Sequence, residues 1–238
     1  MIDTHAHLEI LCDIDEGISK IILAAANIST SRNNLILGKK YPEKLLVSVG
    51  IHPQEIQDSP VELKKIVEEN YEKIMAIGEC GLDFSSEYIL EWQENTFRSQ
   101  IELAQKYNKP LIIHARKAVD ETVEILKEYK NLTGVFHCYA GGIKRIKKVL
   151  DLGENWYFGI DGNLTYEIGL EEVVKNIPKN RIVLETDSPY LTPEPFRRQE
   201  NNPNNVKYIY KKVSEIWEMS FEETEKIIDG NAKKLFKF

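Results

Sequence analysis

The segment IDTHAHL, residues 2–8, places two histidines at the end of a short apolar run. Side chains two apart on an extended chain point to the same side, so His5 and His7 would lie about 7 Å apart along a strand, close enough to share one cation. A single histidine after a strand is more often a hydrogen-bonded core or loop residue than a ligand. The HAH pair favours a metal ligand over that alternative.

The same arrangement recurs along the chain. Histidines end apolar segments in VSVGIHP (His52), PLIIHAR (His114) and GVFHCYAGG (His137). Two carboxylates end similar segments, Glu79 in IMAIGECGLDF and Asp187 in RIVLETDSPYL. Zinc and manganese accept imidazole and carboxylate ligands together. Since no hydrophobic core requires polar side chains at these places, the joint pattern predicts one metal site.

Segments with strand-like and helix-like patterns alternate along the chain, and they decide the fold class. Strands are predicted at residues 1–7, 20–25, 45–52, 74–81, 110–115, 134–137, 156–159 and 181–186, and helices at 30–40, 61–72, 88–107, 119–129, 143–152, 170–176, 204–217 and 221–235. Eight strand and helix pairs predict an α/β fold, a (β/α)₈ TIM barrel, as a single domain over residues 1–238. A doubly wound open sheet is the alternative, but its ligands would gather at one switch point.

Composition and charge limit the possible environments and partners. With 238 residues and 42% hydrophobic side chains, the chain can bury one large core. A net charge of −7 argues against non-specific adhesion to nucleic acid, although a local basic site could still hold a phosphate. The N-terminal MIDTHAHL lacks the pattern of a secretory signal, and no stretch approaches the roughly 18 apolar residues of a membrane span. We therefore expect a cytoplasmic protein with no membrane association.

The cysteines support a reducing compartment. Cys12, Cys80 and Cys138 are few, odd in number and widely spaced, without a CxxC motif. Cys80 and Cys138 adjoin proposed ligands, but alternation along a strand turns neighbours to opposite faces. We expect both to be small packing side chains.

Taken together, the motifs resemble the TatD family of metal-dependent deoxyribonucleases, within the wider metal-dependent hydrolase barrels. The resemblance runs nearly end to end through DTHAHL, GIHP, GECGLDF, IHAR, HCYAGG, ETDSPYLTP and GNAKKLF. It implies a (β/α)₈ barrel that uses up to two divalent cations to hydrolyse phosphodiester bonds in DNA, with aminoacyl-tRNA deacylation also known in the family. The resemblance implies one metal among His5, His7, Glu79 and Asp187, and a second, bridged by Glu79, at His114 and His137.

The implied chemistry gives two further side chains catalytic roles. Asp187 would accept the proton of the attacking water, or act only as a ligand. His52 would contact a phosphate oxygen or protonate the leaving group, or else make a structural hydrogen bond. Zinc, manganese or magnesium could fill the two sites, although four histidines make magnesium less expected.

Contacts to the substrate are predicted from nearby basic and acidic residues. Arg116 lies two residues beyond His114 and suits a phosphate, with a salt bridge at the rim as the alternative. Arg197, in EPFRRQENNPNNV, could reach a nucleic-acid backbone or be solvated. Glu185, two residues before Asp187, is placed at the substrate side, where it would orient a metal-bound histidine or water.

Three further places depart from the family or stay ambiguous. Gln54 follows GIHP, where the family often has a histidine, so no second proton-exchanging group is expected there. Asp83, in GLDF, is expected to serve its loop by accepting backbone amides. The basic segment IKRIKKVL, residues 143–150, would steer DNA or, more simply, form a solvated helix face.

Three function classes compete. The first is a nuclease acting on single strands or strand ends, with DNA as substrate and no obligate protein partner. The second is an amidohydrolase on a small neutral substrate, or an aminoacyl-ester hydrolase, and Arg116 disfavours the neutral substrate. The third is a non-enzymatic metal-bound scaffold, which the complete ligand set disfavours.

Overall fold

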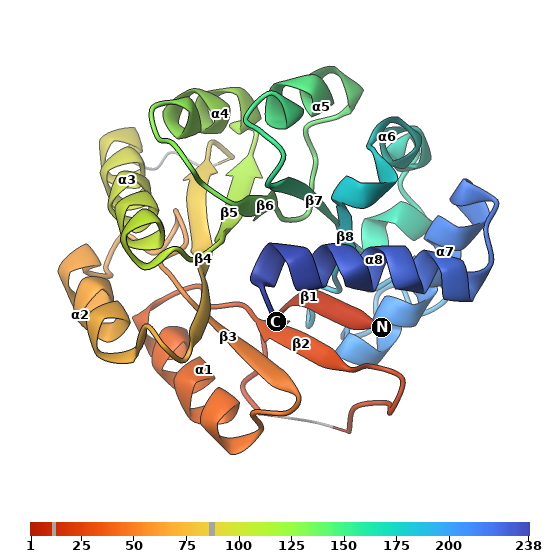
Figure 1. Cartoon of the computed structure of the whole chain (residues 1–238), viewed down its shortest axis with the longest axis horizontal. Helices are drawn as coiled ribbons and strands as arrows, with labels where there is room; N and C mark the ends of the chain where they lie inside the picture. The colour runs from red at the N-terminus through yellow and green to blue at the C-terminus, as the bar shows by residue number, and fades with distance from the viewer. Residues whose placement is uncertain (11–12, 86–88) are drawn as a thin grey trace.

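The computed structural model describes residues 1–10, 13–85 and 89–238, and in these ranges eight parallel strands form one nearly closed barrel surrounded by helices (Figure 1). The strands pair in chain order from β1 to β8, and the bridge between Ala6 and Ser188 joins the last strand region to the first. The strands are β1 (Ile2–Ala6), β2 (Lys20–Leu23), β3 (Leu45–Val49), β4 (Ile74–Asp83), β5 (Leu111–Arg116), β6 (Gly134–Phe136), β7 (Trp156–Ile160) and β8 (Ile182–Leu184). The predicted single-domain TIM barrel is confirmed.

The helices are α1 (Ile28–Lys40), α2 (Pro60–Asn70), α3 (Leu90–Tyr107), α4 (Val119–Lys127), α5 (Ile143–Leu150), α6 (Leu170–Asn176), α7 (Val206–Trp217) and α8 (Phe221–Phe236), with short 3₁₀ turns η1 (Gly162–Thr165), η2 (Lys179–Arg181) and η3 (Pro203–Asn205). A helix follows each strand from β2 to β7, whereas β1 leads to β2 with no helix among the described residues between them, and both α7 and α8 follow β8. Capping boxes at Asn27 and Ser220 fix the first turns of α1 and α8. The predicted helix start at Tyr88, and Cys12, lie outside the described residues.

Several strands end earlier than predicted at their carboxyl ends. The strand predicted at 45–52 ends at Val49, and the one predicted at 181–186 ends at Leu184. Beyond these points the chain leaves the regular ladder, but its amides remain paired, as His52 N to Ala26 O (2.7 Å) and Asp187 N to His5 O (2.9 Å). The ligand-bearing segments are therefore held by specific backbone bonds between neighbouring strand ends.

The amino-terminal end of the barrel interior is apolar and closed. Buried side chains from the strands, among them Ile22, Ile112 and Val183, form one cluster with Leu235 and Phe236 of α8. In Figure 1, α8 runs across this end of the barrel, in front of β1 and β8. Because apolar packing fills that end, the polar side chains of the interior lie at the carboxyl ends of the strands, where TIM-barrel sites form.

A second, larger cluster of apolar side chains packs the outer face of the sheet against the surrounding helices. Cys80 is buried, Cys138 is partly exposed, and both are free thiols. Within the described ranges, no helix has both the length and the apolar character that crossing a bilayer demands.

Candidate metal centre

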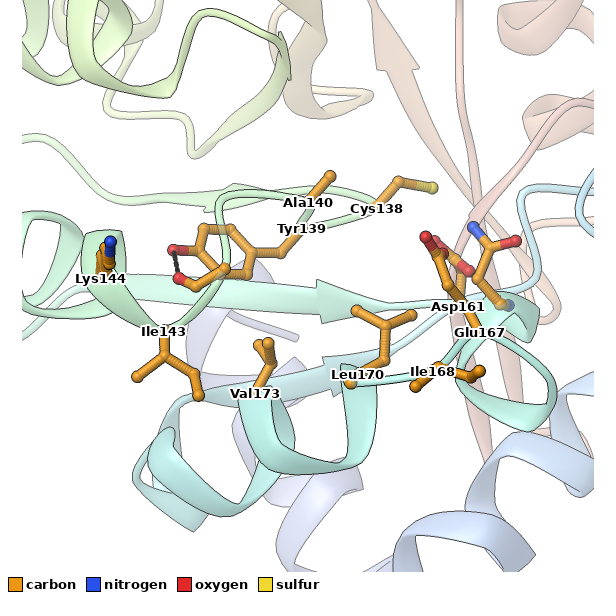
Figure 2. A pocket seen from close by; sticks show the side chains of 13 residues that line it. Cys138, Tyr139, Ala140, Ile143, Lys144, Asp161, Glu167, Ile168, Leu170 and Val173 are labelled. Carbon is orange, nitrogen blue, oxygen red and sulfur yellow. Dashed lines mark hydrogen bonds between the residues drawn. The ribbon is translucent and has the colours of Figure 1, made fainter.

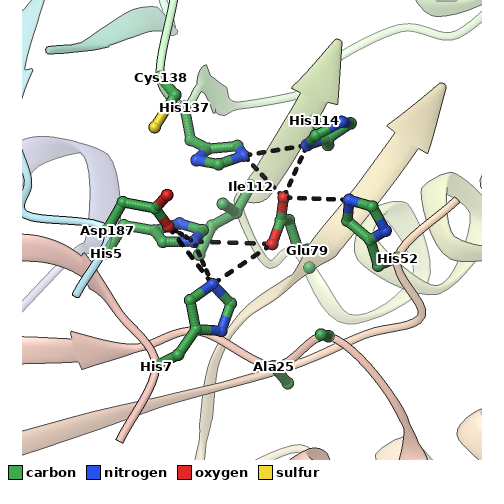
Figure 3. Close-up of polar contacts among 12 residues, drawn as sticks. His5, His7, Ala25, His52, Glu79, Ile112, His114, His137, Cys138 and Asp187 are labelled. Carbon is green, nitrogen blue, oxygen red and sulfur yellow. Dashed lines mark hydrogen bonds and ion pairs between the residues drawn. The ribbon is translucent and has the colours of Figure 1, made fainter. Parts of the chain in front are cut away.

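All seven polar side chains predicted at strand ends meet at the carboxyl-terminal mouth of the barrel (Figure 3). They come from positions within strands or a few residues after them. His5 is fully buried and Glu79 is 4% exposed, so the cluster lies at the floor of the mouth. The members are His5 on β1 and His7 after it, His52 after β3, Glu79 on β4, His114 on β5, His137 after β6 and Asp187 after β8.

One group of donor atoms surrounds a point between β1, β4 and β8. His5 Nε2 and His7 Nε2 lie 3.2 Å apart, and Asp187 Oδ1 lies 3.5 and 3.4 Å from them. Glu79 Oε2 completes the group at 3.7 and 3.6 Å from the same two nitrogens. Ligands about 2.0–2.1 Å from a tetrahedral zinc stand roughly 3.3 Å from each other. The spacing and the donor types fit a bound divalent cation.

A second group surrounds the other oxygen of the same carboxylate. Glu79 Oε1 lies 2.7 Å from His137 Nε2 and 2.8 Å from His114 Nδ1, and these two nitrogens are 3.3 Å apart. His52 Nε2 is farther, 3.7 Å from the same oxygen. Glu79 therefore presents one oxygen to each group, and the residues of both groups can hold metal.

Asp83 sets the orientation of the His114 ring. Its Oδ2 lies 3.1 Å from His114 Nε2 and accepts a hydrogen bond of 2.7 Å from the Gln54 side chain. This contact leaves His114 Nδ1 facing Glu79. The other oxygen of Asp83 accepts the Ser85 amide, which is the loop role expected from the sequence. The contact to His114 was not predicted, although Glu79, residue 81 and Asp83 alternate along β4 and so share the inner face.

Glu185 lies beneath His137 and is fully buried. Its Oε1 accepts the Cys138 amide at 2.5 Å and lies 3.7 Å from His137 Nδ1. Gly159 leaves the room for this carboxylate, since a Cβ there would stand 2.5 Å from Glu185 Oε2. The prediction placed Glu185 among the substrate contacts as an orienting group. Its burial and its distance of 3.7 Å from His137 Nδ1 favour the orienting role, and its assignment as a substrate contact stays a prediction.

Burial and neighbouring side chains shift the pKa values of Glu79 and His5, and these shifts set their protonation states. Burial alone would raise the pKa of Glu79, but the facing His137 and His114 hold it well below its usual range. Burial lowers the pKa of His5 well below the usual value, which favours the neutral imidazole that binds metal. The centre thus combines an ionised carboxylate with at least one neutral ring.

His52 differs from the other histidines in its hydrogen bonding. Its Nδ1 accepts the Gln54 amide at 3.1 Å, and burial lowers its pKa to about 4. A neutral ring whose Nδ1 accepts must carry its proton on Nε2, the nitrogen that faces Glu79. In this state His52 presents an N–H toward the centre, and its ring also lies close enough to Glu79 and His114 to share a cation with them.

The predicted basic contacts lie outside this cluster. Arg116 is exposed at the end of β5 and forms no ion pair within the described part of the chain. Arg197 stacks on the Tyr166 ring, 4.0 Å from its centroid, after β7. Sequence reasoning missed Tyr190, which is 62% exposed with its ring 6.2 Å from that of His7. Its only signal was an aromatic side chain three residues after Asp187.

Comparisons with known proteins agree with this geometry. A family model described as TatD related DNase matches residues 2–237. The uncharacterized metal-dependent hydrolase YabD of Bacillus subtilis (strain 168) is 34% identical over 100% of this chain and 99% of its own. The uncharacterized metal-dependent hydrolase MG009 of Mycoplasma genitalium is 35% identical over 98% of each chain.

Solved structures give the same result. The crystal structure of YJJV, a TatD homolog from Escherichia coli K12, superposes with a TM-score of 0.90 and 26% identity over 100% of this chain and 98% of its own. A TatD family hydrolase from Entamoeba histolytica has a TM-score of 0.85 and 25% identity over 99% and 97% of the two chains. Because these matches span the chain and its metal-binding clusters, the protein belongs to the TatD family and is a metal-dependent hydrolase.

Proposed function

We propose that this protein is a deoxyribonuclease that hydrolyses phosphodiester bonds in single-stranded DNA or at strand ends, with two divalent cations per chain. One observation carries the proposal, the division of donor atoms into two groups that share the Glu79 carboxylate. In our proposal His5, His7 and Asp187 hold one ion with Glu79 Oε2, and His114 and His137 hold the other with Oε1. Zinc and manganese suit these donors best, and magnesium is the third candidate.

A phosphodiester is a demanding substrate, which supports a two-ion site. Its anionic oxygens repel a nucleophile, and its leaving alkoxide is poor. Two bound cations would act as Lewis acids. They would lower the pKa of a bound water toward about 7 and would also offset the negative charge of the phosphate. A neutral amide or ester does not require the second cation.

Two side chains of this protein are suited to act on the water and the phosphate. Asp187 points Oδ1 at His5 and His7, and within the described ranges no group donates a hydrogen bond to its Oδ2. We assign this oxygen to accept a proton from the attacking water. We propose that His52, neutral with its proton on Nε2, donates a hydrogen bond to a phosphate oxygen or to the leaving oxygen, because a neutral imidazole does not give up its remaining proton.

The depth of the centre supports a single strand or a frayed end as substrate. His5 and Glu79 are almost fully buried at the floor of the mouth, and only His7, His52 and His114 of the histidines are partly exposed. A flexible strand can bend a phosphate down to this floor, whereas a stacked duplex cannot. The surface around the mouth includes Arg116, which we propose as a phosphate contact.

The test is hydrolysis of end-labelled single-stranded DNA by metal-stripped protein refilled with Mg²⁺, Mn²⁺ or Zn²⁺, with Asp187→Asn purified in parallel. We expect cleavage that requires metal, is lost in the variant and is slower on blunt duplex. An aminoacyl ester is assayed beside the DNA. Rapid hydrolysis of that ester by protein that leaves DNA intact would replace the proposed function with the alternative.

Two further expectations from the sequence stay predictions. DNA is the proposed substrate partner, and no obligate protein partner is proposed. The cytoplasmic location also stays a prediction, which fractionation of cells expressing the tagged chain would check.

A further inference from the structure

A cavity of about 440 Å³ opens beside the metal centre, between the loop after β6 and the loop after β7 (Figure 2). Its inner end is formed by Cys138 and Asp161, and Cys138 is the residue directly after the proposed ligand His137. Its outer end reaches Lys144 at the start of α5. Nothing in the proposed chemistry uses this cavity. Its link to the centre is Cys138, which lines the cavity and directly follows His137 in the chain.

The walls of the cavity are apolar and partly open to solvent. Leu170 and Val173 of α6 lie on one side with Ile143, and Tyr139 and Ala140 lie across from them (Figure 2). Ile168, on the loop before α6, is fully exposed, and Ile143 is 48% exposed. Exposed apolar side chains that border a cavity next to a catalytic centre are typical of a surface that packs against a flat, apolar group of the ligand.

The two ends of the cavity carry different polar groups. Asp161 is 5% exposed, and its Oδ1 accepts the Asn163 amide at 2.7 Å. At the outer end Lys144 is exposed and, in the part of the chain that the structure describes, forms no ion pair. The other three cations of α5 are all paired with carboxylates, Arg145 and Lys148 with Asp120 and Lys147 with Asp151.

We propose that this cavity binds one nucleobase of the substrate strand, next to the scissile phosphate, while Lys144 contacts a backbone phosphate at the outer end. The inference rests on the proposed nuclease function. A base has two apolar faces and a polar edge, which match the apolar walls and the Asp161 end. The strand that carries this base also has a negatively charged backbone phosphate, which could reach Lys144 at the outer end of the cavity. An aminoacyl side chain would match the walls but would bring no anion to that lysine.

The proposal is tested with two variants of the cavity and one control. Ile168→Ser removes an exposed wall, and Ala140→Trp fills the cavity from an exposed position, so neither change disturbs buried packing. Ile36→Ser is the matched control, because Ile36 is 65% exposed on α1, away from the cavity. Each protein is assayed on a single-stranded oligonucleotide and on a strand of the same length built from abasic nucleotides.

We expect Ile168→Ser and Ala140→Trp to raise KM on the normal strand by about tenfold, the loss expected for one stacked base. On the abasic strand all four proteins should have the same KM. For wild type this KM should be higher than its KM on the normal strand, because no base fills the cavity. Equal KM values for the cavity variants and Ile36→Ser on the normal strand would overturn the proposal. Equal losses on both strands would also overturn it, since the cavity would not be reading a base. If wild type cleaves neither strand, the proposed function itself fails.

Discussion

At the scale of single residues, the centre depends on side chains that hold the ligands as well as on the ligands. Asp83 contacts His114 Nε2 and also accepts from Gln54, so it fixes which ring nitrogen faces Glu79. Carboxylates in this position orient a metal-bound histidine and increase its basicity. Gln54 thus has a structural role in this chain, since its side chain donates to the carboxylate that contacts His114.

Asp83→Asn should weaken metal binding by about 10- to 100-fold, because the His114 ring loses its charged partner. The measurement is a competition titration of metal-stripped protein with a chromophoric chelator. Asp120→Asn serves as the control, since that carboxylate pairs only with Arg145 and Lys148 on the surface. An unchanged affinity in Asp83→Asn would show that His114 needs no such support.

The clustering of the proposed ligands was predictable from sequence, whereas their supporting contacts were not. Each proposed ligand is a polar residue that ends an apolar segment, and this pattern is visible in one dimension. The contact of Asp83 with His114 depends on how β4 and β5 pair, Tyr190 takes its place from the path of a loop, and the proton of His52 depends on the Gln54 backbone amide. Those features depend on tertiary contacts that periodicity does not encode.

At the scale of elements, α8 closes the amino-terminal end of the barrel. Leu235 is fully buried and Phe236 is 1% exposed, and both pack with interior residues of the strands. The helix begins at a capping box formed by Ser220 and Glu223. Its role is therefore to complete the apolar half of the interior, far from the metal ligands at the other end.

Leu235→Ala should lower the free energy of unfolding by about 2–5 kcal/mol, because it leaves a cavity in close-packed surroundings. Urea denaturation followed by circular dichroism measures the loss. Since the metal ligands lie at the opposite end of the strands, the metal affinity of the folded variant should equal that of wild type. A loss below about 1 kcal/mol would show that α8 does not close the barrel in this way.

The type and order of the elements followed from the alternation of patterns, but their carboxyl ends did not. After Val49 the apolar Ile51 extends the strand-like pattern, and after Leu184 the β-branched Thr186 does so, which predicts longer strands than the structure has. In the structure these residues leave the ladder and bond to neighbouring strand ends instead, as His52 does with Ala26. That departure serves the site and cannot be read from propensity.

At the scale of the whole molecule, the charge state of the centre links metal binding to pH. Burial opposes the charged form of His7, but a hydrogen bond with Asp187 and the charge of Glu79 raise its pKa above the usual 6.5. Asp83 and Glu79 act on His114 in the same direction against its burial. Both rings must lose their protons before they can bind metal.

Metal affinity should therefore rise with pH and should continue to rise above 6.5, since protons compete for raised-pKa imidazoles. Calorimetric titrations with Mn²⁺ in buffers of different ionisation enthalpy, between about pH 5 and 8, would measure both the affinity and the protons released. Binding that is independent of pH over this range would mean that His7 and His114 do not act as ligands.

The shared-carboxylate centre is tested most directly by titrating metal-stripped protein with Mn²⁺ and following bound metal and hydrolysis of single-stranded DNA in the same samples. We expect activity to reach its plateau only at about two ions per chain, the occupancy of a bridged two-metal site. We also expect Glu79→Gln, folded by circular dichroism, to bind less metal and not to cleave. Full activity without metal, or in Glu79→Gln, would contradict the shared-carboxylate centre.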